Sequence, residues 1–390
     1  MSVATVSLGE LCGILSGFAW SASKFNQDRR GLPIIRIQNV DAVLSNHFVY
    51  WDEPYDERFV IRQGDLLLTL SGSFRIESWS GPDALLNQRI IKLTPSPKLD
   101  RGWLLHVLRP RLGQIERLGK HALVNNVSLG DIRSLAIPLP PLAEQRRIAE
   151  VLDRAEALRA KRSKALAQLD SLTQSLFLDL FGDPATNPKG WPRVEFKELL
   201  SNIDSGWSPK CLDRPVTGKE WGILKLGAVT WCEYNPAENK ALPPDVEPDA
   251  AIEVKRGDLL FARKNTYELV AACAMVRATP PRLLMSDLIF RLRLRSDAKV
   301  DSTFLHQLLI YPTKRRDIQK LAGGSAGSMP NISKARLETT AIEVPPISLQ
   351  REFARQVTAV EALKTAHRAS LTELDALFAT LQHRAFRGEL

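Results

Sequence analysis

Residues 137–182 read IPLPPLAEQRRIAEVLDRAEALRAKRSKALAQLDSLTQSLFLDLFG and carry the clearest structural pattern of the chain. After Pro140-Pro141 it contains no glycine or proline until Gly182, and it is rich in alanine, leucine, glutamate, arginine and glutamine, which favour helices. The double proline ends any earlier element, so a helix begins directly after it. The pattern predicts one helix of about 40 residues, which would be roughly 60 Å long at about 1.5 Å per residue.

The same pattern occurs a second time near the C-terminus, where residues 342–388 read IEVPPISLQREFARQVTAVEALKTAHRASLTELDALFATLQHRAFRG. Aligned without a gap, residues 126–182 and 331–387 are identical at 18 of 57 positions. Upstream the match is weaker, with GDLL at 64–67 and 257–260 and Ser-Gly at 16–17 and 205–206. The chain is therefore an internal duplication. We divide it into residues 1–140, 141–183, 184–345 and 346–390.

Apolar residues recur along both predicted helices at alternating steps of three and four, as in a coiled-coil seam. A helix this long cannot bury such a stripe against one compact domain, so we expect the two helices to pair antiparallel. The alternative is that each helix packs separately on its own domain. The predicted seam consists of Ile148, Leu152, Ala155, Leu158, Ala165, Leu169, Leu172 and Leu176 in the first helix and Phe353, Val357, Val360, Leu363, Leu371, Leu374, Leu377 and Leu381 in the second.

Polar residues interrupt the seam midway in both helices, at Arg162 and His367. A polar residue at such a position often fixes the register of the pair. The residues assigned to helix pairing or partner docking are Gln145, Ile148, Leu152, Leu158, Arg162, Leu169, Gln350, Phe353, Val357, Leu363, His367 and Leu374.

The two diverged parts, residues 1–140 and 184–345, alternate strand patterns with short helical ones. Strands are predicted at 34–37, 66–70, 89–93, 223–226, 259–262 and 288–294, and helices at 103–108 and 303–309. The expected fold class is α/β of the mixed α+β kind. Two similar domains are separated by an antiparallel coiled coil of the two long helices, and a pseudo-two-fold internal repeat relates the halves.

Charge favours an anionic partner with two footprints. The net charge is +9; residues 1–140 hold 16 basic and 13 acidic residues, and residues 184–345 hold 24 and 19. Arginine, lysine, asparagine and glutamine can pair with base edges, and serine with phosphate. The candidate DNA-binding residues, taken from polar loops in both copies, are Lys24, Asn26, Gln27, Arg29, Arg30, Ser73, Arg75, Gln88, Arg89, Lys120, Asn125, Trp207, Lys210, Arg263, Lys264, Asn265, Lys314, Arg315, Arg316, Ser328 and Asn331.

No catalytic motif is expected in the chain itself. None of its Pro-Pro pairs has the flanks of the (Asp/Asn)-Pro-Pro-(Phe/Tyr) loop of amino methyltransferases, and no GxGxxG or GxxxxGK(S/T) phosphate loop occurs. Pro248-Asp249 followed by Glu253-Val254-Lys255 superficially resembles a nuclease triad. The gap of three residues is too short to place the two carboxylates on adjacent strands, so we assign no catalytic residue.

Metal binding and membrane association are also not expected. The four cysteines lie far apart and form no zinc-ligand spacing. No apolar run approaches the roughly 20 residues that span a bilayer. The N-terminus has no basic start and carries Glu10, which is not typical of a signal peptide. We therefore expect a cytoplasmic protein without a metal site.

The chain resembles the specificity subunits of type I restriction–modification systems. The most specific element is residues 137–148, IPLPPLAEQRRI, at the start of the first long helix. The second copy, IEVPPISLQREF at 342–353, departs from this pattern, with Leu349 where glutamate is usual. The GDLL elements and the Ser-Gly near each domain start match the family pattern too, and the resemblance covers essentially the whole chain.

The resemblance implies that each diverged part is a target recognition domain for one half of a split double-stranded DNA site. The paired helices would set the spacing of the half-sites and dock two modification (methyltransferase) subunits. Those subunits would bind S-adenosylmethionine and methylate adenine at N6. A restriction (motor-nuclease) subunit would complete the enzyme, and this chain would be non-catalytic and hold no cofactor.

Other functions fit parts of the sequence. One is a specificity subunit of a related non-type-I system that serves a fused nuclease–methyltransferase, which would lack a separate methyltransferase gene nearby. Another is a coiled-coil scaffold that binds no DNA, which a gel-shift assay would reveal. An autonomous enzyme would require methyl transfer or cleavage by the purified chain alone.

Overall fold

The structure is a computed structural model that describes residues 4–40, 47–119, 127–323, 329–387 and 389. It divides into two compact units. The first consists of Met1–Lys164 with Ala369–Leu390, and the second is Ala165–Arg368. Each unit therefore combines one diverged part of the chain with a segment of each long helix. The boundaries between the diverged parts and the helices given above remain a prediction.

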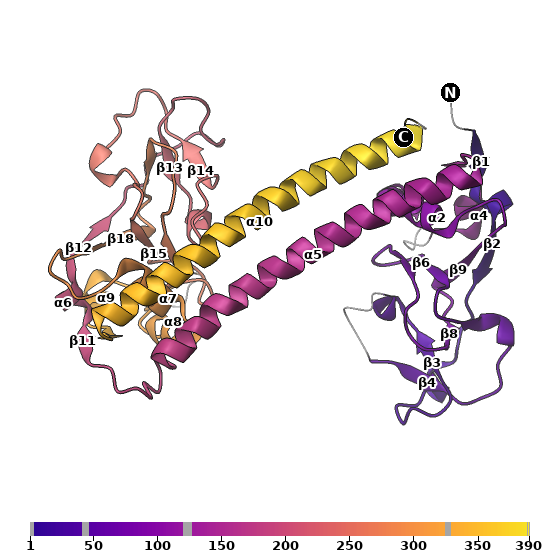
Figure 1. The fold of residues 1–390 in the computed structure, drawn as a ribbon, viewed down its shortest axis with the longest axis horizontal. Helices are drawn as coiled ribbons and strands as arrows, with labels where there is room; N and C mark the ends of the chain where they lie inside the picture. The colour runs from indigo at the N-terminus through magenta and orange to yellow at the C-terminus, as the bar shows by residue number, and fades with distance from the viewer. Residues whose placement is uncertain (1–3, 41–46, 120–126, 324–328, 388, 390) are drawn as a thin grey trace. The chain divides into compact units, whose positions relative to one another are not determined.

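The first unit contains two four-stranded sheets and a two-stranded ribbon (Figure 1). The ribbon pairs β1 (Thr5–Ser7) with β10 (Ala136–Pro138). The sheet order β2-β9-β6-β7 joins Cys12–Ser16, Ile90–Pro95, Leu66–Thr69 and Ile76–Ser78. The order β4-β3-β8-β5 joins Val49–Trp51, Leu32–Ile35, Ala84–Leu86 and Val60–Ile61. The short helices are α1 (Leu8–Leu11), α2 (Arg101–Leu108), α3 (Leu112–Gly119) and α4 (Leu129–Ser134).

The second unit repeats this topology in its described residues, except that its second sheet has three strands. The ribbon pairs β11 (Arg193–Glu195) with β19 (Ala341–Glu343). One sheet has the order β12-β18-β15-β16, from Leu200–Ser205, Ile289–Leu294, Leu259–Ala262 and Cys273–Met275. The other has the order β14-β13-β17, from Asn239–Ala241, Gly222–Leu224 and Leu283–Leu284. The short helices are α6 (Phe196–Leu199), α7 (Ser302–Ile310), α8 (Pro312–Gln319) and α9 (Lys334–Glu338). The expected strands and helices are confirmed, except that the strands expected at 34–37 and 223–226 stop at Ile35 and Leu224 and are followed by 3₁₀ turns. The expectation of two similar domains is confirmed as well.

Both long helices form as predicted: α5 spans Leu142–Phe181 and α10 spans Ile347–Arg387. Each begins after its double proline. α5 ends where Gly182 adopts a positive φ of 78° and its N–H donates to Leu178 O at 2.8 Å. Glycine occupies this left-handed position without steric penalty, which explains why the helix stops there.

The two helices run antiparallel where they meet inside each unit. In the first unit, Ile148 and Leu152 near the start of α5 share a core with Phe378 and Ala385 near the end of α10. In the second unit, Phe353 and Val357 near the start of α10 share a core with Phe177 and Phe181 near the end of α5. The globular part of each unit is thus packed against the start of its own long helix and the end of the other. The alternative of two helices that pack separately is wrong.

The seam differs from the predicted one at four leucines. Leu158, Leu172, Leu363 and Leu377 are 42–52% exposed. The neighbouring residues Arg159, Thr173, Lys364 and Phe378 face the seam instead: Thr173, Lys364 and Phe378 are buried, and Arg159 contacts α10. Steps of three and four fit either of two adjacent columns of a helix, and periodicity alone did not separate them. The central Arg162 and His367 are half-buried.

None of the helices in the described part of the chain is both long and apolar enough to cross a membrane.

Candidate nucleic-acid interface

A cluster of loops in the first unit forms where β2, β6 and β8 end. Gly17 follows β2 and donates its N–H to Ile90 O at 3.1 Å. The N–H of Phe18 donates to Leu86 O at 3.0 Å, and Phe18 O accepts from the N–H of Gln88 at 3.0 Å. These backbone bonds fix residues 17–18 against the turn at residues 87–89, which connects β8 with β9.

The loop after β6 joins the same cluster. Leu70 N–H donates to Arg89 O at 2.9 Å. The Thr69 hydroxyl donates to Ser73 O at 2.7 Å and accepts from the N–H of Arg75 at 2.8 Å. Four predicted DNA-binding residues are thereby brought together, namely Ser73, Arg75, Gln88 and Arg89.

The second unit builds an equivalent cluster. Trp207 N–H donates to Met285 O at 3.0 Å, as Phe18 does to Leu86. Arg263 N–H donates to Leu288 O at 3.1 Å, as Leu70 does to Arg89. The predicted residues Trp207, Arg263 and Lys264 lie in these segments.

The two clusters share a backbone frame but present different side chains. Arg89 of the first cluster corresponds to Leu288 of the second, and Leu70 corresponds to Arg263. The Arg263 guanidinium donates to Asn331 Oδ1 at 3.1 Å and lies over the Phe290 ring, 4.9 Å from its centroid. Each cluster therefore carries arginine donors at a different place on the same frame, which suits two different base sequences.

A second group of predicted residues lies elsewhere in the first unit. Asn26 pairs with Tyr50 of β4 through its backbone, at the far edge of the sheet β4-β3-β8-β5. Lys24 forms an ion pair with Glu53, at 3.2 Å. Arg30 lies 3.6 Å from Asp52. This group, which also contains Gln27 and Arg29, lies beside β4, and β3 separates β4 from β8, at whose end the loop cluster forms.

Several predicted residues of the second unit serve the scaffold. Lys314 is buried, and its ammonium donates to Ala341 O and to Glu343, 2.6 Å away. Asn265 is buried too, and its amide donates to the hydroxyl of Thr230 at 3.3 Å. The prediction of DNA contact is wrong for these two residues, because neither side chain reaches the surface.

The remaining predicted residues divide into three groups. Arg315 is half-buried and donates to the carbonyls of residues 268–270, so it supports the end of the loop that begins at Arg263. Lys210 and Arg316 are exposed. Lys120, Asn125 and Ser328 lie outside the described residues.

Sequence reasoning missed two residues of the clusters. Phe18 is exposed at the position equivalent to Trp207, and the Ser-Gly that precedes each of them was the available signal. Lys334 lies 5.7 Å from the centroid of Phe290, the ring that Arg263 also covers. Lys334 is the first residue of α9, and only its charge could have identified it from the sequence.

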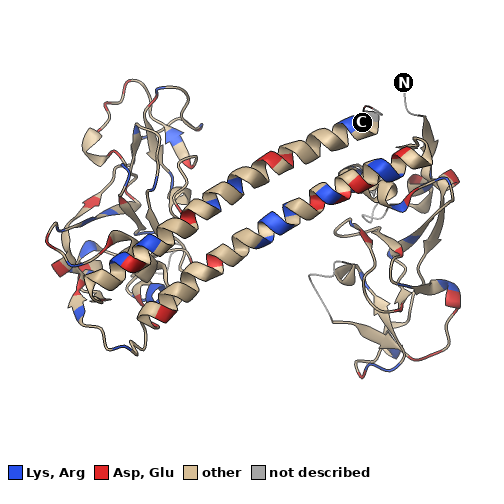
Figure 2. Ribbon diagram, in the orientation of Figure 1, with Lys and Arg blue, Asp and Glu red and all other residues tan. Residues whose placement is uncertain are grey.

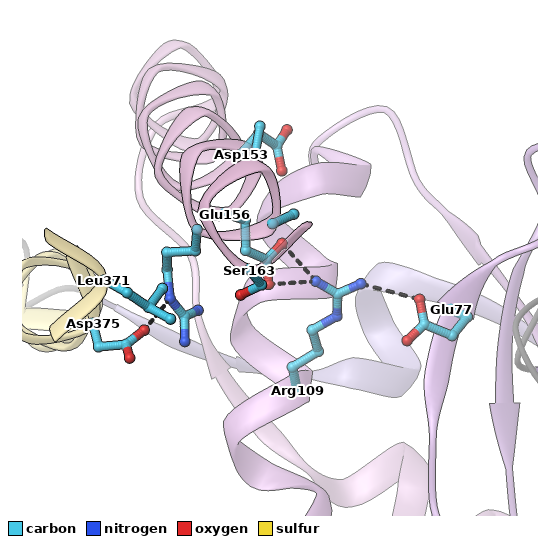
Figure 3. Close-up of a pocket in the computed structure, with 10 residues that line it drawn as sticks. Glu77, Arg109, Asp153, Glu156, Ser163, Leu371 and Asp375 are labelled. Atoms are coloured by element: carbon cyan, nitrogen blue, oxygen red, sulfur yellow. Dashed lines mark hydrogen bonds and ion pairs between the residues drawn. The ribbon is translucent and has the colours of Figure 1, made fainter. Parts of the chain in front are cut away.

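Ion pairs hold α5 against the globular part of the first unit (Figure 3). Arg109, just after α2, donates to both carboxylate oxygens of Glu156 on α5 at 2.8 and 2.9 Å, and to Glu77 of β7 at 3.0 Å. Burial alone would lower the pKa of Arg109, but the two carboxylates outweigh it and raise that pKa. On the same face, His106 Nε2 lies 2.8 Å from Asp153 Oδ1. His106, Asp153 and Glu156 have ligand atoms within 4.8 Å of one another, a spacing that a metal could use, but Arg109 already engages Glu156.

The signature glutamines link each helix to its recognition domain. Gln145 is fully buried; its Oε1 accepts from Asp100 N–H at 2.7 Å, and its Nε2 donates to Lys98 O at 3.0 Å and Pro140 O at 2.8 Å. Gln350 makes the same three contacts with residues 301, 299 and 345 at 2.7–3.1 Å. The glutamine of the signature is therefore a structural connector.

The carboxylates of the nuclease-like stretch also have structural roles. Asp249 accepts from the N–H of Ala251 at 3.0 Å and caps a short 3₁₀ turn. Glu253 accepts from the N–H of Arg282 at 2.8 Å.

Comparison with known proteins agrees with this organisation. The family described as "Type I restriction modification DNA specificity domain" matches residues 2–169. The EcoEI specificity subunit of Escherichia coli is 33% identical over 43% of this chain, a match that covers 28% of that protein. The EcoBI specificity subunit, also from Escherichia coli, is 25% identical over 99% of this chain and 85% of its own length.

A solved structure shares the fold. The S subunit of a type I restriction–modification system from M. genitalium superposes with a TM-score of 0.66 at 16% identity, over 98% of this chain and 96% of that one. The same assignment is supported by the duplicated topology, by the paired helices and by relatives that match nearly the full length of the chain. Residues 2–169 match the type I restriction modification DNA specificity domain family, and nearly the whole chain is similar to a type I restriction–modification specificity subunit.

Proposed function

We propose that this chain reads a two-part double-stranded DNA target for a methyltransferase complex, with one half-site taken by each loop cluster. The observation that carries the proposal is the repeated frame: the same backbone hydrogen bonds hold the two clusters, while the donors on them differ. Such a frame lets two readers evolve different base preferences without loss of fold. As a specificity subunit the chain is non-catalytic.

The four exposed leucines support a docking role for the helices. Leu158 and Leu172 on α5 are equivalent in the repeat to Leu363 and Leu377 on α10, and all four are exposed beside the seam. Basic and acidic residues are interspersed along both helices (Figure 2), so no single sign of charge dominates them. An apolar row between mixed charges suits a protein partner better than DNA. We assign these exposed leucines to the docking of two modification subunits. Because the leucines recur in both copies of the repeat, the two docking surfaces would be equivalent.

The chemistry would come from those partners. The modification subunits would bind S-adenosylmethionine and methylate adenine N6, and restriction subunits would complete the assembly. The complex would act in the cytoplasm, where the host DNA is. The chain itself would supply the base contacts, the spacing between half-sites and the docking surface.

The test begins with methylation mapping of the host genome, with and without the gene, which defines the target sequence. The chain is then purified with its modification subunit and titrated with the target duplex and with duplexes altered in one half. We expect binding that is selective by roughly 10³-fold or more and weakens steeply with salt. Equal affinity for all duplexes, or a methylome unchanged by loss of the gene, would contradict the proposal.

A matched pair of variants locates the interface. Arg89→Ala removes an exposed donor of the first cluster, and Arg117→Ala removes an exposed arginine of α3 outside it. We expect the first to weaken binding of one half-site by about 5- to 150-fold, since a base contact is worth about 1–3 kcal/mol, and the second to have little effect. The reverse order would place the interface elsewhere.

A further inference from the structure

Each of the two loop clusters contains one exposed aromatic side chain. Hydrogen bonding to base edges does not account for these rings, because they carry no donor or acceptor that the proposed function uses. Phe18 is 47% exposed and Trp207 is 39% exposed, and they occupy equivalent positions directly after the Ser-Gly of each copy. Burial of such large rings is normally favoured, so two exposed rings at matching places need a reason.

The backbone at these positions is tightly defined. A Cβ added at Gly17 would lie 2.2 Å from Asn87 O, and one added at Gly206 would lie 2.2 Å from Ser286 O. No other residue fits there, so glycine lets the chain pass close under the turn. The N–H of the next residue then donates to Leu86 O, at the end of β8, or to Met285 O, directly after β17, at 3.0 Å in both units.

The ring of Phe18 is supported from behind. Its centroid lies 4.9 Å from that of Trp20 and 5.5 Å from that of Phe59. Trp20 is in turn fixed by a hydrogen bond from its Nε1 to Leu86 O at 3.0 Å. A supported ring on a fixed backbone loses little conformational entropy when it stacks on a ligand.

The surroundings indicate what the rings would meet. Phe18 O accepts from the backbone N–H of Gln88, and the exposed Arg89 is the next residue; the cluster around Trp207 contains Arg263 and Lys264. An apolar ring within a set of cationic and amide donors matches the chemistry of a nucleobase, which offers a π-face, polar edges and a nearby phosphate.

We propose that Phe18 and Trp207 are equivalent aromatic wedges, each of which stacks on the bases of one DNA half-site. This proposal rests on the proposed function, and it adds stacking of an aromatic ring on the bases to the hydrogen bonds that read base edges. A wedge stabilises an unstacked base step, and removal of an adenine from the stack for methylation needs such a step. The ring would thereby hold the DNA in a deformed state, while neighbouring donors read base edges.

The experiment uses the chain in complex with its modification subunit and duplexes of the mapped target, with 2-aminopurine placed singly along each half-site. We expect Phe18→Ala to weaken binding at least about tenfold and to change 2-aminopurine fluorescence in the first half-site only. Trp207→Ala should do the same in the second half-site. Phe18→Trp and Trp207→Phe should retain at least half of the wild-type affinity.

Matched controls remove an exposed aromatic ring away from the clusters. Tyr55→Ala serves the first unit and Trp231→Ala the second, and both should bind DNA like wild type. The wedge proposal is overturned if the alanine variants bind like wild type, if their 2-aminopurine signals do not change, or if the aromatic exchanges lose as much affinity as alanine. Failure of the wild-type complex to select its target would instead refute the proposed function.

Discussion

Arg159 on α5 lies 2.5 Å from Asp375 on α10, measured from Nε to Oδ1, and its guanidinium covers the Phe378 ring at 4.7 Å from the centroid. The repeat supplies the same pair a second time with the helices exchanged: Lys364 Nζ on α10 lies 2.7 Å from Asp170 Oδ1 on α5. An antiparallel pair of equivalent helices must repeat each cross-helix contact in this way. The two ion pairs therefore define the register of the helices within each unit.

The two pairs should differ in strength. The Arg159 side chain is 33% exposed and that of Asp375 is 49% exposed, so solvent screens this pair and we expect Asp375→Asn to cost less than about 1 kcal/mol of unfolding free energy. Lys364 is buried; burial alone would lower its pKa, but hydrogen bonds to Asp170 and Glu361 outweigh this and raise it. Asp170→Asn should cost more, about 1–3 kcal/mol, because a buried ammonium loses a partner. Thermal and urea unfolding measure both, with the exposed Asp179→Asn as a control. Equal losses would contradict the difference in burial.

Replacement of the buried Gln145 by glutamate should destabilise the folded chain. In Gln145→Glu the acceptor for Asp100 N–H is kept, but a carboxylate then faces the carbonyls of Lys98 and Pro140 without a donor. We expect a loss of about 2–4 kcal/mol in unfolding free energy, against little change for the exposed Gln168→Glu on the same helix. An unfolding midpoint like that of wild type would show that the connector is dispensable.

The buried His306 should make the second unit sensitive to acid. Burial lowers its pKa from 6.5 to about 4, while its Nε2 donates to Cys273 O at 3.1 Å. The imidazole of His306 therefore takes up a proton more readily in the unfolded chain than in the folded chain. Stability is therefore complete above about pH 6.5 and is lost as the pH falls toward 4, by on the order of 3 kcal/mol. Urea unfolding of wild type and His306→Gln between pH 7 and 4 should show a shallower slope for the variant. The exposed His383→Gln should keep the wild-type slope.

The exposed leucine row should matter for assembly and not for folding. Leu158→Glu and Leu363→Glu change side chains that are each 52% exposed, so the unfolding free energy of the isolated chain should move by less than about 0.5 kcal/mol. Affinity for the modification subunit should fall at least about tenfold, because a charge would enter an apolar contact. Analytical ultracentrifugation or co-purification measures this. If both variants assemble like wild type, the partner docks elsewhere.

Helix length should set half-site spacing. One heptad inserted after Arg162 alone shifts α5 against α10, so the Arg159–Asp375 and Lys364–Asp170 pairs cannot both form. We expect weakened assembly. A matched heptad inserted after His367 restores both pairs and lengthens the helices by about 10 Å, equal to roughly three base pairs. Methylation mapping of this double insertion should show a longer spacer with the same half-sites. An unchanged spacer with full activity would contradict the role of the helices in spacing.

Much of the organisation was predictable from residues alone. The absence of glycine and proline after Pro141 and Pro346 determines the long helices, because nothing in those stretches interrupts hydrogen bonding of the backbone. The repeat of 18 identities in 57 positions determines that the two halves share a topology, since homologous sequences fold alike. The GDLL stretches likewise predicted β6 and β15, because a run of apolar residues after a turn has to be buried.

Long-range packing, which the sequence pattern does not contain, determines which column of each helix forms the seam and which loop residues reach the surface. Leu158 and Arg159 both satisfy a heptad pattern, and burial of one or the other depends on the partner helix and its Asp375. Lys314 and Arg89 look alike in the sequence, since each is a basic residue in a polar stretch. Lys314 is nevertheless buried, where its ammonium pairs with Glu343, whereas Arg89 is exposed. The sequence periodicity reports local geometry, whereas the side of the chain that faces solvent is set by contacts between residues far apart in sequence.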